Sequence, residues 1–93
     1  MNVDYASLEA DVENGTFRQQ LEEELTVGFR LIRDSGERLP VASHYASQIA
    51  AIVGRNAPEP LNPELAFSVY QEILSACEQA RALVLGEPPP PVA

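Results

Sequence analysis

Few side chains in this chain could do chemistry: one histidine, one cysteine and fourteen carboxylates, alongside six arginines and no lysine. A histidine can transfer protons near neutral pH, but catalysis by His44 would also need a nucleophile or carboxylate held close by the fold. Ser43 and Ser47 are only its neighbours in sequence. We therefore expect His44 to be a partly exposed surface residue. An enzyme that uses His44 is the least favoured interpretation, and no catalytic residue is predicted.

Cys77 lies among apolar residues in the middle of an expected helix. A reactive cysteine needs exposure and a nearby cation or helix N-terminus, so we predict a buried, unreactive thiol. A single cysteine cannot form an internal disulfide or complete a structural zinc site, and we expect no metal and no cofactor. This cysteine usage is typical of a reducing compartment and predicts a cytoplasmic protein.

The carboxylates are unevenly distributed, within a net charge of -8. The first 24 residues hold seven acids and one arginine, whereas the rest of the chain holds seven acids and five arginines. Consecutive acids on a helix point about 100° apart, so Glu22, Glu23 and Glu24 cannot converge on one ion. Nor does the spacing match a calcium loop or a di-iron site. The candidate partner-binding residues are Asp4, Glu9, Asp11, Glu13, Glu22, Glu23 and Glu24.

These acids would form one continuous patch if the first two helices pack along each other. The phosphates of nucleic acid and anionic membranes repel such a surface, so we expect neither direct nucleic-acid binding nor membrane binding. A protein with a basic surface would be attracted to it. We therefore predict a non-enzymatic protein–protein interaction module: an inhibitor, an immunity-type protein or an adaptor. The same charge could also serve only to keep the protein soluble.

The elements that must position these residues are helices. Apolar residues recur at helical spacing in four segments, and no segment alternates convincingly as a strand does. The sequence therefore predicts an all-α fold, a small helical bundle with three main helices and a short N-terminal helix. The expected helices are residues 4–13, 17–34, 41–53 and 63–85. Residues 1–86 are expected to form a single helical domain, and residues 87–93 a proline-rich C-terminal tail in polyproline II conformation.

Local signals indicate where these helices begin and end. Thr16 with Gln19 matches a capping box at the start of the second helix. Asn62, followed by a proline, is typical of a helix N-cap. Pro40 is expected in the first turn of the third helix, and Gly54 is expected to end it.

The apolar faces are wider than a three-helix monomer requires. Val27 and Leu31 broaden the stripe of the second helix, and Gly28 is expected to let another helix or an aromatic ring approach closely. A stripe of alanines on the third helix suits close packing on a neighbour: Ala42, Ala46 and Ala50. A homo-oligomeric structural or assembly subunit, such as a homodimer, is therefore the alternative function.

Two further expectations concern origin and targeting. The lysine-free, alanine- and arginine-rich composition is typical of a small bacterial or phage protein. The first fifteen residues lack the basic and apolar regions of a signal peptide. No run approaches the ~18 apolar residues of a membrane span.

Overall fold

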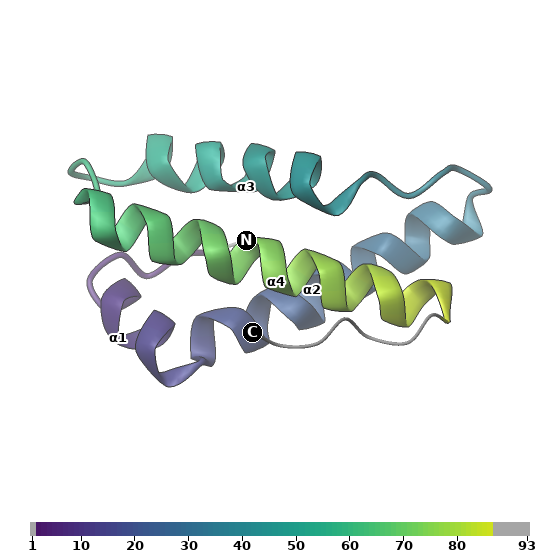
Figure 1. The fold of residues 1–93 in the computed structure, drawn as a ribbon, viewed down its shortest axis with the longest axis horizontal. Coiled ribbons are helices and arrows are strands. Elements are labelled where there is room, and N and C mark those ends of the chain that lie inside the picture. The colour runs from purple at the N-terminus through teal and green to yellow at the C-terminus, as the bar shows by residue number, and fades with distance from the viewer. Residues whose placement is uncertain (1, 87–93) are drawn as a thin grey trace.

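The computed structural model of this protein describes residues 2–86, and the expected polyproline tail lies outside the described residues. The described chain forms four helices and no strand: α1 (Leu8–Asn14), α2 (Thr16–Asp34), α3 (Ala42–Asn56) and α4 (Pro63–Leu85) (Figure 1). The predicted all-α bundle of three main helices and a short N-terminal helix is thereby confirmed.

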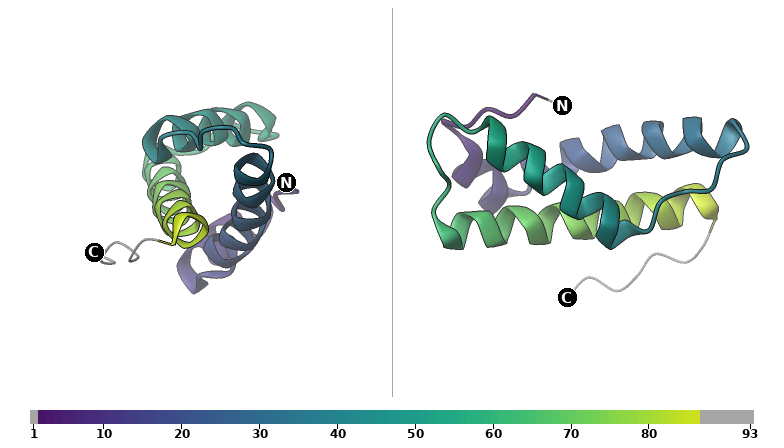
Figure 2. Two further views of the ribbon diagram at one scale, coloured as in Figure 1. Left: turned by 90° about the vertical axis from the view of Figure 1, so that its right-hand side faces the viewer. Right: turned by 90° about the horizontal axis from the view of Figure 1, so that it is seen from above.

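The longest helix, α4, is the element on which the others pack, since α1, α2 and α3 each contact it. α2 and α4 run in the same direction, and α3 runs antiparallel to both (Figures 1 and 2). Where α2 and α4 end, Arg33 Nη1 donates to the carbonyl oxygen of Val84 at 2.9 Å. Arg81 Nε donates to the carbonyl oxygen of Pro40 at 3.0 Å. These two hydrogen bonds join the C-terminal end of α2 and the segment just before α3 to the last turns of α4.

The core is formed by one face of each long helix. α2 buries a row of side chains at a spacing of four: Phe17, Leu21, Leu25 and Phe29. α4 buries a broader face against them: Val69, Ile73, Ala76, Cys77, Ala80 and Val84. Each large apolar side chain removed from water stabilises the fold by about 1.5–3 kcal/mol, so this face fixes α2 onto α4.

The start of the first helix differs from the prediction, because α1 begins at Leu8 rather than at residue 4. Asp4 closes a turn instead. Its Oδ1 accepts a hydrogen bond from the Ala6 amide at 3.1 Å, and its carbonyl oxygen accepts one from the Ser7 amide at 3.2 Å. An aspartate that bonds to the backbone two residues ahead favours a turn over a helix.

The predicted capping box at the start of α2 is wrong. The Asn14 side chain accepts the hydrogen bond of the Thr16 amide at 2.9 Å, and Thr16 makes no side-chain cap. Gly15 joins α1 to α2 with a φ of 84°, a left-handed conformation that glycine adopts without steric cost. The chain therefore turns sharply at Gly15. The Thr16 and Gln19 amides, which a capping box would satisfy, donate instead to the Asn14 side chain and to the Gly15 carbonyl oxygen.

α3 begins and ends later than predicted. Pro40 precedes the helix instead of occupying its first turn, and Gly54 lies inside it, since α3 continues to Asn56. Ala57 is extended, with φ -64° and ψ 136°. A residue before a proline is sterically excluded from the helical region, so Pro58 sets the end of α3 and not the glycine.

The ends of α4 are as predicted. Asn62 Oδ1 accepts a hydrogen bond from the Leu65 amide at 2.8 Å, and Pro63 occupies the first turn. Gly86 ends the helix with a φ of 72°. None of the helices within residues 2–86 combines the length and apolar character that a membrane crossing requires.

Two predictions about the apolar face of α2 are wrong, and one about α3 is confirmed. Val27 and Leu31 are 59% and 67% exposed, because they lie on the side of α2 turned away from α4. Gly28 meets no other helix within 4 Å of the position that a Cβ would take. The alanines of α3 do pack on the core as expected: Ala46 is fully buried, with Ala42 and Ala50 half-buried beside it.

Candidate functional site

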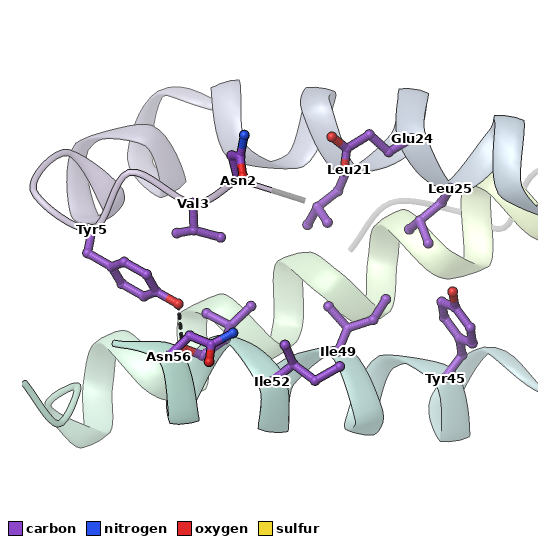
Figure 3. A pocket seen from close by; sticks show the side chains of 11 residues that line it. Asn2, Val3, Tyr5, Leu21, Glu24, Leu25, Tyr45, Ile49, Ile52 and Asn56 are labelled. Carbon is purple, nitrogen blue, oxygen red and sulfur yellow. Dashed lines mark hydrogen bonds between the residues drawn. The ribbon is translucent and has the colours of Figure 1, made fainter. Parts of the chain in front are cut away.

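An open groove lies between α2 and α3. Both helices pack on α4, yet no Cα atom of α2 lies within 8 Å of one in α3. The space between them is about 590 Å³. We call it the α2–α3 groove, and it is lined by Asn2, Val3, Tyr5, Leu21, Glu24, Leu25, Tyr45, Ile49, Ile52, Val53 and Asn56 (Figure 3).

Aliphatic side chains form the walls of this groove. Leu21 and Leu25 point down from α2 toward Ile49 and Ile52 of α3 (Figure 3). The two leucines are buried in the core, whereas Ile52 is 47% exposed. An isoleucine this exposed beside other aliphatic residues leaves apolar surface in contact with water, which costs free energy unless it is covered.

Aromatic residues close the two ends of the groove. At one end, the Tyr5 hydroxyl donates to the carbonyl oxygen of Val53 at 2.7 Å, which ties the N-terminal segment across to α3. At the other end, the rings of Phe29 and Tyr45 meet edge to face with centroids 5.5 Å apart. Of these two contacts, the ring contact joins α2 to α3 directly, and the hydrogen bond attaches the N-terminal segment to α3.

A second hollow of about 310 Å³ adjoins the groove. Three carboxylates line it, from the N-terminal turn, α1 and α2: Asp4, Asp11 and Glu24. We call it the acidic hollow. Asn2, Val3 and Glu24 line both spaces, so the hollow and the groove lie directly beside each other.

The acidic hollow is held in place by short-range hydrogen bonds. The Ser7 hydroxyl donates to Asp11 Oδ2 at 2.9 Å, and the turn at Asp4 fixes that carboxylate close to α1. Glu24 and Asp4 are exposed, and Asp11 is half-buried. No arginine or histidine within residues 2–86 lines either the hollow or the groove.

The other four candidate acids lie elsewhere. Glu9 and Glu13 line a smaller hollow of about 190 Å³ together with Glu64 of α4. Glu22 pairs with Arg18, with Arg18 Nε 3.2 Å from Glu22 Oε1, and Glu23 is exposed. The structure thus brings Asp4, Asp11 and Glu24 together around one space, Glu9 and Glu13 around another, and compensates the charge of Glu22.

His44 and Cys77 occupy the kinds of position that the sequence predicts. His44 is exposed on α3, with its Nε2 3.4 Å from Gln48 Nε2. Cys77 is fully buried in α4. Burial and the neighbouring Glu78 raise the pKa of its thiol from 9.0 to about 11. At neutral pH the thiolate that would be needed for nucleophilic or redox chemistry is therefore almost absent.

Metal binding finds no support in the arrangement of these side chains. Within residues 2–86, no group of three or more His, Cys, Asp or Glu residues lies close enough together to hold a metal ion.

The sequence analysis does not predict the groove, and Glu24 is the one lining residue that it names as a candidate. The spacing of Tyr45, Ile49, Ile52 and Val53 is typical of one apolar stripe along α3. In the structure the stripe is divided: Val53 is 2% exposed and faces the core, whereas Ile52 is 47% exposed at the groove. Ile52 and Val53 are consecutive and therefore point about 100° apart on the helix. A single neighbouring helix cannot cover both side chains, and this was the signal in the sequence that could have indicated an exposed apolar residue.

Comparison of the chain with protein-family models, with curated proteins and with solved structures found no match. Its function is therefore argued from the geometry and charge of its own residues.

Proposed function

We propose that this protein is a non-enzymatic interaction module that binds the basic surface of a partner protein, as an inhibitor, an immunity-type protein or an adaptor does. One observation supports this proposal above the others. Asp4, Asp11 and Glu24 line one hollow into which no cationic side chain of residues 2–86 projects. The single free thiol accords with a partner met in the reducing cytoplasm.

Uncompensated charge of this kind acts mainly on association. Carboxylates that lack an internal cation keep their attraction for external cations, and a cluster of them steers a basic partner toward one face. Elsewhere on the molecule arginines reduce the field: Arg18 pairs with Glu22, and Arg33 with Asp34. The hollow of Glu9, Glu13 and Glu64 also has no cation of residues 2–86 on its lining, but it is smaller, about 190 Å³ against about 310 Å³. We therefore expect the strongest attraction at the acidic hollow.

The test compares two variants of equal net charge. The double substitution Asp4→Asn with Glu24→Gln removes two charges from the acidic hollow. The control, Glu37→Gln with Glu59→Gln, removes two from exposed positions outside it, and both variants have a net charge of -6 instead of -8. The probe is fluorescein-labelled deca-lysine, an unstructured cationic peptide without an apolar face, and its Kd is measured by fluorescence anisotropy.

The hollow variant is expected to bind deca-lysine about threefold to tenfold more weakly, because each exposed charge pair contributes about 0.2–1 kcal/mol. The control is expected to lose clearly less. Both differences should disappear at about 1 M salt, where the Debye length falls to about 3 Å. Equal losses in the two variants would mean that the charge acts only through its total, as it does when it serves solubility.

A homo-oligomeric assembly subunit is the second candidate, and a different observation favours it. Four large apolar side chains of α2 and α4 are 59–67% exposed: Val27, Leu31, Phe67 and Leu83. A second copy of the chain that covered them would stabilise an oligomer by burying apolar surface. Light scattering on a size-exclusion column decides this candidate, because a dimer at both low and high salt would support it and a monomer at both would remove it.

A further inference from the structure

We infer that the α2–α3 groove is the docking site for a basic amphipathic helix of the partner protein, whose apolar face enters the groove while its cations meet the acidic hollow. This inference rests on the proposed function and identifies the structure that the partner presents. Two spaces that share Glu24, Val3 and Asn2 make it possible for one ligand to use both.

The dimensions of the groove fit the apolar face of a helix. Along α3 its lining extends from Tyr45 to Asn56, which is about 16 Å of helix axis. Anchor side chains at positions i, i+4 and i+7 of a partner helix span about 10 Å. The groove volume of about 590 Å³ equals that of a small-molecule pocket, about 300–1,000 Å³, and therefore gives room for a few anchor side chains of a partner helix.

The position of the groove also favours a helix. α2 and α3 diverge on one side of α4 and leave aliphatic side chains on both walls. A partner helix placed between them would form a four-helix arrangement with α2, α3 and α4. It would also cover Ile52, the most exposed aliphatic residue of the lining. Burial of this surface is the source of affinity in a groove that recognises helices.

Charge complementarity identifies which helix would bind. Glu24 lines both spaces, and Asp4 and Asp11 lie in the adjoining hollow. With no cation of residues 2–86 on either lining, an acidic or neutral helix would leave the charge of three carboxylates uncompensated. Lysines or arginines beside the apolar anchors would pair with these carboxylates. A second copy of this chain, with a net charge of -8, would bring like charges together there.

The experiment uses a synthetic helical peptide as probe. Leucines and one central tryptophan occupy the i, i+3, i+4 and i+7 positions, and lysines occupy the others. The protein contains no tryptophan, so the emission of the peptide reports directly on burial of the anchor. One control peptide has the same composition with its apolar residues spread around the helix, and a second has glutamate in place of every lysine.

The patterned lysine peptide is expected to show a blue shift of its tryptophan emission on binding and a Kd about tenfold or more below that of the spread peptide. Ile52→Gln, at the edge of the groove, should weaken it about tenfold. Leu31→Gln changes an aliphatic residue on the far side of α2 that is 67% exposed, against 47% for Ile52. It should change the Kd of the peptide by no more than about twofold. Circular dichroism establishes that both variants keep their helix content.

Four results would overturn the inference. Two come from the peptides: the patterned and spread peptides bind equally well, or the glutamate peptide binds as well as the lysine peptide. The third is that Ile52→Gln and Leu31→Gln have equal effects on the Kd, and the fourth is that the free protein is a dimer which Ile52→Gln converts to a monomer. The last would assign the groove to a second copy. Deca-lysine has no apolar face, so its binding tests the acidic hollow alone. The proposed function can therefore pass its own test even when one of these four results rules out a helix in the groove.

Discussion

At the scale of the residue, Cys77 shows how burial decides chemistry. The same thiol in an exposed position could react, but in the interior of α4 the charged form is disfavoured, and the pKa rises from 9.0 to about 11. The sequence predicts this burial correctly, because the helical spacing of Cys77 with Ile73 and Ala80 is a local property. Its unreactive character follows from the same spacing.

A pH dependence follows from this pKa. The thiol keeps its proton up to about pH 11 in the folded protein and loses it near pH 9.0 once unfolded. Its contribution to stability is therefore fully present below pH 9 and lost as the pH rises to 11, by about 3 kcal/mol in total. Denaturant titrations at pH 8 to 11 should show this loss, and Cys77→Ala should show a shallower one. Parallel pH profiles for both proteins would contradict the assignment.

Gly28 provides a second prediction at this scale. It lies inside α2 with no other helix within 4 Å of an added Cβ. Gly28→Ala should therefore raise the free energy of unfolding by up to about 1 kcal/mol, since alanine loses less backbone entropy in a helix. Gly15→Ala is the opposing control, because a φ of 84° strains any residue with a side chain. A destabilised Gly28→Ala protein would show that another segment approaches α2 there.

At the scale of the element, the sequence predicts what is determined locally and misses what depends on competition. The helix start at Asn62 is correct because one side chain and one proline suffice to define it. The capping box predicted at Thr16 is wrong because the Thr16 amide donates to the Asn14 side chain. In a capping box that amide would donate to the Gln19 side chain. α3 extends beyond its predicted end because Pro58, and not Gly54, determines where the helix ends.

At the scale of the whole molecule, the separation of α2 and α3 creates the groove, and no pattern within either helix specifies that distance. It depends on the packing of both helices on α4 and on the long-range ring contact of Phe29 with Tyr45. The distribution of the acids depends on the fold in the same way. Helix periodicity already places Asp11 on the opposite side of α1 from Glu9 and Glu13, about 200° away. Only the packing of α1 on α2 brings Asp11 to the same hollow as Glu24 and Asp4.

The central claim is that the location of the charge, and not its total, directs binding. It is tested most directly by titrating ¹⁵N-labelled protein with unlabelled deca-lysine at about 0.01 M salt, where the Debye length is about 30 Å, and following every backbone amide by NMR. We expect the largest shifts at Asp4, Asp11 and Glu24 and their neighbours, with small shifts at Glu37 and Glu59. Shifts of similar size at all exposed carboxylates would contradict the claim.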